Sequence, residues 1–284
     1  MKKSYCICNK SICIEAEYFP GDNPLWKLFE TDDTAADINV SCRLCDELPP
    51  IPSVNAKKSG EFRISADGET VYREFPMGTV AGALTVYSPA DTSSSNTFFT
   101  QRSFPVMMDG RYMWSSVSLA QLLLPKNAFF IHSSYISVQG KAILFSAPSG
   151  TGKSTQAALW EKHRNAEVIN GDKAGILVEN GAYACGVPFC GTSGICKNKT
   201  FPLGAVVLLG QAPENSIRRL AGIEALQGVL RNVYLDLIAP GEQGAIIDLL
   251  ITLLETVPVY MLNCTADENA VITLEKELQN GGVI

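Results

Sequence analysis

The pattern of apolar and polar positions changes character about a third of the way along the chain. Before residue 110, short apolar or alternating runs are typical of β-strands and occur at 4–15, 38–44, 82–87 and 97–102. Residues 62–75 resemble a hairpin that turns at Asp67 and Gly68. The Ser-rich, Pro-containing stretch 88–96 indicates a loop between two strands. The first 110 residues are therefore predicted to form a β-rich domain.

After residue 110 the pattern mixes strands with helices. Strands are expected at 128–138, 141–146, 167–170, 203–209 and 258–263, with a hairpin over 174–185 that turns at 180–181. Helical spacing is found at 116–124, 153–163, 222–233, 241–256 and 266–279. We expect an α/β domain over 111–284 with a mixed sheet and flanking helices. The whole chain would then be α+β, with two domains at 1–110 and 111–284.

The composition fits a globular protein, with 46% hydrophobic and 18% charged residues among 284. The formal net charge of -6 argues against a nucleic-acid partner, because binding to phosphates needs a basic surface. Most of the negative charge falls in the first 110 residues, where it could receive a basic peptide or simply form a solubilising surface. The sequence contains neither a signal-peptide pattern nor an apolar run of membrane-spanning length. We therefore expect a cytoplasmic protein with no membrane partner.

The chain has nine cysteines, an odd number that favours reduced thiols over a disulfide framework. Five of them raise the question of a metal site, provided that two segments meet: Cys6, Cys8, Cys13, Cys42 and Cys45. Their spacing lacks the regularity of zinc fingers, and the first two would share one face of a strand. Buried reduced cysteine is the simpler alternative.

Residues 141–155 read KAILFSAPSGTGKST, an apolar strand followed by a glycine-rich loop and the start of a helix. This is the P-loop (Walker A) pattern, with Ala147 in place of the first glycine. In such a loop main-chain N–H groups surround phosphate, Lys153 reaches the terminal phosphates and the Ser154 hydroxyl binds magnesium. We expect ATP, or another nucleoside triphosphate, with Mg2+. The predicted nucleotide-binding residues are Ala147, Pro148, Ser149, Gly150, Thr151, Gly152, Lys153, Ser154 and Thr155.

A carboxylate is needed beside the phosphates, and Asp172 follows the apolar strand 168–170 a short way downstream. Its alternative role is that of a simple turn residue after a strand. His132 lies in the apolar strand before the phosphate loop, where it could contact phosphate or be a hydrogen-bonded core residue. His163, at the end of a predicted helix, is expected on the surface, where it complements the helix dipole.

The loop over 186–200 is rich in glycine and contains further polar candidates. Lys197 and Lys199 could neutralise phosphate charge or meet an acceptor. Ser193, between Gly191 and Gly194, could form an anion-binding turn. The alternative is an ordinary solvated connection with its lysines outside.

Taken together, FFIHSSYISVQGKAILFSAPSGTGKSTQAALW and VINGDKAGIL resemble the catalytic domain of HPr kinase/phosphorylase, which has a phosphoenolpyruvate-carboxykinase-like P-loop fold. GVPFCGTSG, PLGAVVLLGQAPENSIRRL and EAL resemble HPr-kinase-like proteins of peptide-modification clusters, including those that phosphorylate serine on lasso-peptide precursors. The resemblance covers residues 128–231. It implies a homo-oligomer, because such kinases often form hexamers.

The resemblance also implies roles for two residues. Asp172 would hold magnesium or act as the base toward a hydroxyl, and His132 would stand near the transferring phosphate. The family has two adjacent aspartates where this chain has Gly171 and Asp172, so one carboxylate would serve both tasks. The chain has no clear counterpart of the long loop that the bifunctional enzyme uses for its phosphorylase reaction. We therefore expect a kinase only.

The leading hypothesis is Mg-dependent phosphoryl transfer from ATP to a hydroxyl. The acceptor would be serine or threonine of a peptide or small protein, or a small metabolite. A carboxykinase is one alternative, although it needs a second metal site with lysine and histidine, and the chain has only two histidines. A nucleotide-binding regulatory module without transfer is the other.

Overall fold

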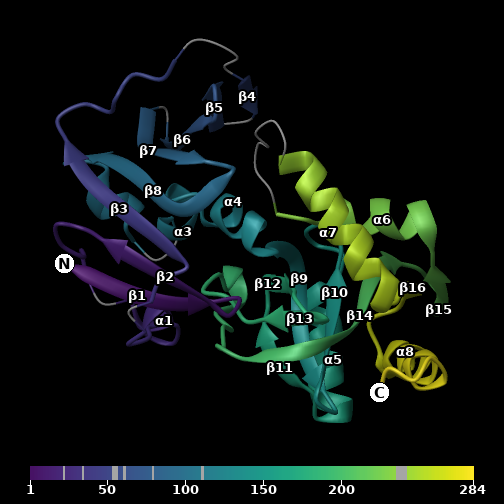
Figure 1. Ribbon diagram of the computed structural model, residues 1–284. Helices are drawn as coiled ribbons and strands as arrows, with labels where there is room; N and C mark the ends of the chain where they lie inside the picture. The colour runs from purple at the N-terminus through teal and green to yellow at the C-terminus, as the bar shows by residue number, and fades with distance from the viewer. Residues whose placement is uncertain are drawn as a thin grey trace. The chain divides into compact units, whose positions relative to one another are not determined.

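The computed structural model describes residues 1–21, 23–33, 35–52, 57–59, 62–78, 80–109, 112–234 and 242–284. The chain divides into two compact units, each with its own sheet (Figure 1). The first comprises Met1–Ala128 with Leu235–Ile246, and the second comprises Phe129–Tyr234 with Ile247–Ile284. Two mixed sheets with flanking helices confirm the predicted α/β class.

The first unit contains an eight-stranded sheet in the order β1-β2-β3-β8-β7-β6-β5-β4. Its strands are β1 Lys2–Ile7, β2 Lys10–Glu15, β3 Ile38–Cys45, β4 Lys57–Ser59, β5 Phe62–Asp67, β6 Thr70–Met77, β7 Val80–Ser88 and β8 Asp91–Thr100. β3 pairs in parallel with both β2 and β8, whereas the other pairs are antiparallel. The predicted β-rich character of this part is confirmed.

Two details of the first sheet differ from the prediction. Asp67 pairs with Thr70, so the β5–β6 hairpin turns at residues 68–69, and Gly68 has a φ of 58°. Most of the stretch predicted as a loop belongs to β8. The side chain of Thr92 is buried, and its Oγ1 donates to Leu122 O at 2.9 Å. A hydroxyl side chain that donates to a buried acceptor can lie on the inner face of a strand, and a pattern based on hydropathy alone does not predict such a strand.

The boundary between the units also differs from residue 110. Four short helices lie in the first unit, namely α1 Pro24–Lys27, α2 Phe104–Met107, α3 Met113–Ser116 and α4 Leu119–Leu123, with a 3-10 turn η1 at Leu124–Lys126. α2 and α3 pack on β7, and α4 packs on β8. Because these helices cover the first sheet, the first unit extends to Ala128, and 235–246 also belongs to it.

The five cysteines considered as metal ligands do not assemble into a site. Among the described residues, no group of three or more His, Cys, Asp or Glu side chains could hold a metal ion. Cys8 has left β1 and lies in the β1–β2 turn with a φ of 53°, so it does not share a strand face with Cys6. Burial raises the pKa of the Cys42 thiol to about 12. All nine cysteines are free thiols.

The second unit is built on the strand order β10-β9-β12-β13-β14-β16-β15, with β11 beside β9. Its strands are β9 Ala128–Val138, β10 Lys141–Ser146, β11 Glu167–Asn170, β12 Lys173–Val178, β13 Ala182–Cys185, β14 Thr200–Gln211, β15 Ser216–Leu220 and β16 Val259–Cys264. β14 pairs in parallel with β10 on one side and β16 on the other. The phosphate loop thus follows a strand in the buried centre of the sheet.

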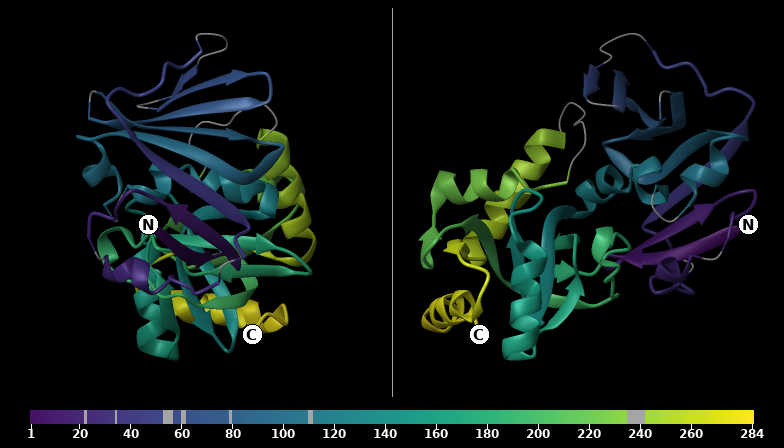
Figure 2. Two further views of the ribbon diagram at one scale, coloured as in Figure 1. Left: turned by 60° about the vertical axis from the view of Figure 1, so that its left-hand side comes forward. Right: turned by 180° about the vertical axis from the view of Figure 1, so that it is seen from behind.

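The helices of this part are α5 Lys153–Arg164, α6 Gly222–Leu230, α7 Glu242–Thr256 and α8 Glu268–Asn280, with a 3-10 turn η2 at Gly191–Ser193. The first residues of α7, 242–246, belong to the first unit. α5 and α8 pack side by side (Figure 2). Trp160 of α5 and Leu274 of α8 are fully buried in one core with Phe145 and Val207 of the sheet. In the part of the chain that the structure describes, no helix combines the length and the apolar character needed to cross a bilayer.

The predicted helix over 222–233 ends early, because Arg231 is the C-cap of α6 and residues 232–234 run along β9. His132 N donates to Asn232 O at 2.8 Å, and Tyr234 N donates to Phe130 O at 2.8 Å. These backbone bonds satisfy groups of β9 that would otherwise lie at a sheet edge. The strand β15 was not predicted, because its exposed residues Arg218 and Arg219 break the apolar pattern.

Candidate functional site

The segment between β10 and α5 has the backbone of a phosphate-binding loop. Gly150 and Gly152 have φ values of 79° and 110°, and an added Cβ at either position would meet no atom within 4 Å. Glycine is therefore needed at both for its left-handed backbone and not for space. Gly152 is the N-cap of the twelve-residue α5. The loop thus ends at a helix N-terminus, where N–H groups and the helix dipole favour an anion.

The side chain of Lys153 lies back over the start of the loop. Its Nζ donates to Ala147 O at 2.9 Å and to Pro148 O at 3.2 Å, and the residue is 8% exposed. Burial lowers the pKa of this ammonium, while the charge of Asp172 raises it. Ala147 itself is buried in the core, which explains why a small residue is required there. The ammonium is therefore held at the end of the loop where terminal phosphates are expected.

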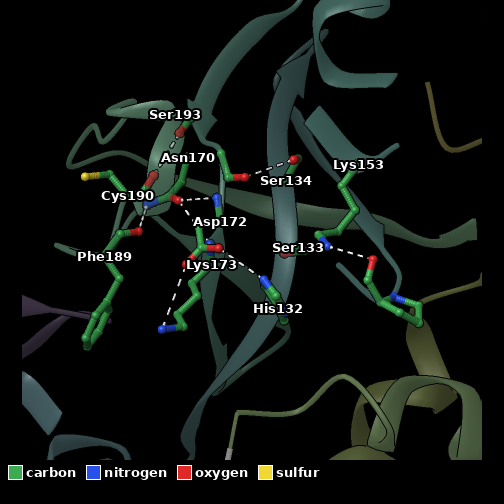
Figure 3. Close-up of polar contacts among 12 residues, drawn as sticks. His132, Ser133, Ser134, Lys153, Asn170, Asp172, Lys173, Phe189, Cys190 and Ser193 are labelled. Atoms are coloured by element: carbon green, nitrogen blue, oxygen red, sulfur yellow. Dashed lines mark hydrogen bonds and ion pairs between the residues drawn. The ribbon is translucent and has the colours of Figure 1, made fainter. Parts of the chain in front are cut away.

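Asp172 and His132 are in direct contact (Figure 3). His132 Nε2 lies 3.1 Å from Asp172 Oδ1, and Lys173 Nζ lies 3.9 Å from Asp172 Oδ2. The pKa of Asp172 is lowered, chiefly by the hydrogen bond from His132 and further by the charges of Lys173, His132 and Lys153, although burial acts in the opposite direction. Asp172 is therefore an ionised carboxylate in the neighbourhood of the phosphate-loop lysine.

Asn170 holds Asp172 in place, and the sequence analysis did not single it out. Its side chain is fully buried. Nδ2 donates to Val187 O and Phe189 O, each at 2.9 Å, and Oδ1 accepts from Asp172 N at 2.9 Å and Lys173 N at 3.0 Å. One amide thus joins the turn that carries Asp172 to the loop after β13. The signal available in the sequence was an Asn two residues before the Asp, which favours a turn of this kind.

The glycine-rich loop closes tightly on the turn at 171–172. A Cβ added to Gly171 would overlap Ser193, and a Cβ added to Gly191 would lie 2.8 Å from Asp172 Cγ. Ser193 Oγ donates to Cys190 O at 2.8 Å and accepts from Ile195 N at 3.2 Å. Ser193 therefore occupies the space that a side chain at 171 would need. Its role in an anion-binding turn stays a prediction.

The structure pairs the other predicted polar residues with glutamates. Lys197 Nζ and Lys199 Nζ lie 2.9 Å and 2.8 Å from Glu167 Oε1 at the start of β11. Hydrogen bonds from Lys199 and Lys197 lower the pKa of Glu167. A phosphate or acceptor contact for these lysines stays a prediction. His163, in the last turn of α5, is partly buried beside Glu268 at 3.4 Å.

Two predicted oxygen ligands suit magnesium chemically. The hydroxyl of Ser154 is exposed in the first turn of α5, and Asp172 supplies an ionised carboxylate. Hydroxyl and carboxylate oxygens are the hard ligands that Mg2+ takes in nucleotide sites. The donor set therefore fits magnesium, with the remaining ligands left to phosphate oxygens and water.

A cavity of about 400 Å3 lies beside the loop in the second unit. Its polar wall includes His132, Ser146, Arg231, Asn232 and Tyr234, and its rim includes Ala147 and Pro148. No local sequence pattern predicts this cavity, because its lining comes from separate segments, among them 232–234, which are held to β9 by backbone bonds.

Comparison with known proteins yields little. No protein-family model and no curated protein sequence matches the chain. Among solved structures, the HPr(Ser) kinase/phosphatase from Coxiella burnetii is similar over 54% of this chain and 90% of that chain, with 12% sequence identity and a TM-score of 0.33. A likeness at this level shows nothing about function.

Proposed function

We propose that the protein is a Mg2+-dependent kinase that transfers the γ-phosphoryl group of ATP to a hydroxyl. The observation that carries the proposal is the combination of a phosphate loop with a nearby ionised carboxylate. Lys153 lies at the head of the loop, and Asp172 contacts His132 at 3.1 Å. A loop alone would support nucleotide binding, whereas the added carboxylate and imidazole supply groups that can handle a hydroxyl proton.

The loop residues bind and orient the donor. The N–H groups from Gly150 to Ser154 would surround the β- and γ-phosphate oxygens, at the positively polarised end of α5. Lys153 would move its ammonium from the two loop carbonyls to the terminal phosphates. Magnesium, held by Ser154 and Asp172, would neutralise charge that develops on the phosphates.

Asp172 would contact the hydroxyl of the acceptor and take its proton. In the transfer step the acceptor oxygen bonds to the γ-phosphorus, the bond from that phosphorus to the β–γ bridging oxygen breaks, and ADP leaves. The hydroxyl proton passes to the Asp172 carboxylate, which His132 orients through Oδ1. Because phosphoryl transfer depends mainly on positioning and charge, the modest basicity of a carboxylate is sufficient. Serine or threonine of a peptide or small protein is the acceptor class that we test first.

The experiment is transfer of label from [γ-32P]ATP with Mg2+, using serine- and threonine-containing peptides and hydroxyl metabolites as acceptors. We expect label in an acceptor with the native chain and with Lys162→Met, which changes an exposed lysine of α5. We expect labelling with Lys153→Met to be slower by a factor on the order of 10²–10³. If the native chain binds ATP but no acceptor is labelled and ADP forms only slowly, the protein is a nucleotide-dependent regulatory module instead.

A further inference from the structure

The cavity beside the phosphate loop borders the end of the loop that receives the terminal phosphate. Its rim is formed by Ala147 and Pro148, and their carbonyl oxygens hold the ammonium of Lys153. In P-loops this lysine reaches the β- and γ-phosphates. A molecule in the cavity would therefore lie next to the group that is transferred.

The cavity also reaches the residue that orients the carboxylate. His132 lines it and contacts Asp172 on the other side, at 3.1 Å (Figure 3). The cavity wall at Asn232 and Tyr234 is fixed to β9 by two backbone hydrogen bonds of 2.8 Å. The ring of Tyr234 is further held by Lys173, whose Nζ lies 3.9 Å from the ring centroid. These contacts fix the cavity wall in place next to the proposed site of transfer.

The charge of the lining favours an anion. The described residues that line the cavity include Arg231 and no Asp or Glu. Arg164 and Arg218 of the same unit each bind a glutamate with two nitrogens. The Arg231 guanidinium, in contrast, makes no hydrogen bond or ion pair with any residue in the described ranges. A guanidinium matches the two oxygens of a carboxylate or phosphate, and this geometry gives selectivity as well as affinity.

We infer that this cavity binds the acceptor, and that Arg231 selects hydroxyl compounds that carry a phosphate or a carboxylate close to the hydroxyl. The inference rests on the proposed kinase function and favours a small-molecule acceptor over serine or threonine of a peptide. The apolar remainder of the lining, with Leu208, Leu209 and Met261, would contact the carbon skeleton of the acceptor. The cavity volume of about 400 Å3 falls in the range of small-molecule sites, which begins at about 300 Å3.

The test uses three probes that differ in charge but share a glycerol skeleton: glycerol, D-glycerate and glycerol 3-phosphate. Calorimetry measures their binding to the whole chain after saturation with Mg2+ and a non-hydrolysable ATP analogue, so that the phosphate loop is already filled. We expect at least one anionic probe to bind tenfold or more tightly than glycerol. The stronger of the two anionic probes identifies the anion as carboxylate or phosphate.

Arg231→Gln should weaken that binding at least tenfold, with the affinity for the ATP analogue unchanged. The matched control is Arg219→Gln, which removes an exposed arginine outside the cavity and should leave both affinities unchanged. The inference is overturned if neither anion binds the loaded protein better than glycerol, or if Arg231→Gln binds them as well as the native chain. Failure of the native chain to bind the ATP analogue would instead refute the proposed function itself.

Discussion

The imidazole of His132 lies 3.1 Å from the carboxylate of Asp172, although forty positions separate the two residues in the sequence. The contact forms because β9 carries His132 beside the turn after β11, where Ser133 N donates to Asp172 O at 3.0 Å. The backbone pairing alone thus brings the two side chains close enough for a polar contact. An imidazole that orients a carboxylate beside a phosphate loop is the feature that separates this site from a simple nucleotide-binding loop.

Asp172→Asn should abolish transfer while the fold persists. The amide keeps the shape of the carboxylate and a hydrogen bond to His132, but it has no charge for magnesium and cannot take a proton. We expect a loss in kcat on the order of 10²–10⁴, the range typical of a missing general base. Transfer at the native rate in this variant, with labelled ATP as donor, would remove Asp172 from the mechanism.

The same variant predicts a pH dependence of stability. The pKa of Asp172 in the folded chain lies below its ordinary value of 3.8. Its contribution to stability is therefore complete above about pH 4 and is lost as the pH falls through the lower, folded pKa. In urea unfolding, the stability advantage of the native chain over Asp172→Asn should shrink as the pH falls below about 3.8. A difference that is independent of pH would contradict the assigned shift.

Lys153→Met should prevent productive nucleotide binding. Methionine keeps most of the buried stem of the side chain, so the core around Ala147 remains packed, but the charge directed at the phosphates is gone. We expect transfer to fall by a factor on the order of 10²–10³, as for other single electrostatic contacts to a reacting group. The measurement is the rate of label transfer, and circular dichroism checks the fold. Lys162→Met, on the exposed side of the same helix, should change neither.

Continuous apolar runs made part of the fold predictable from sequence. The strands β9, β10 and β11 have the predicted limits, and α5 begins at the predicted Lys153. β8 was missed because Thr92 and its neighbours are polar, although Thr92 is buried with its hydroxyl bonded to a backbone oxygen. β15 was missed because it is an edge strand with arginines that face solvent.

One part of the candidate site, the phosphate loop, was predictable from sequence, and another part, the cavity, was not. A phosphate loop is local, since its glycines, lysine and serine are consecutive, and the sequence therefore displays it completely. The cavity depends on Arg231 and Tyr234, which reach the loop only because 232–234 pairs with β9. No local pattern around Arg231 indicates that pairing, and its helical spacing predicted a longer α6.

Asn170→Ala should destabilise the second unit and disturb the carboxylate. The change leaves two carbonyl oxygens and two N–H groups without the partner that the buried amide provides. We expect a loss of about 2–4 kcal/mol in the free energy of unfolding, because buried polar groups that lose their partners are costly. Urea denaturation measures this. Asn269→Ala, on the exposed first turn of α8, should change stability by less than about 0.5 kcal/mol.

Alanine substitutions at two glycines of the loop after β13 distinguish the effect of backbone strain from that of a collision with the Asp172 carboxylate. Gly191 and Gly194 have φ values of 53° and 67°, so alanine at either position adopts an unfavourable left-handed backbone at about 1–2 kcal/mol. Only the Cβ at 191 meets the site, at 2.8 Å from Asp172 Cβ and 3.0 Å from Asp172 Oδ1, whereas the Cβ at 194 meets nothing within 4 Å. The two variants thus share the strain and differ in the collision.

Gly191→Ala should therefore lower transfer at least about tenfold, because displacing a group that positions the acceptor by about 1 Å can cost up to 10²-fold in rate. Gly194→Ala should lose similar stability in urea and keep its rate of transfer within about twofold, since its Cβ points into open space. Equal rates in the two variants would mean that the loop backbone at 190–194 shifts to accommodate the added Cβ and that Asp172 stays in place. Slower transfer in Gly191→Ala alone would show that the position of this carboxylate, held from one side by His132 and limited on the other by Gly191, controls the reaction.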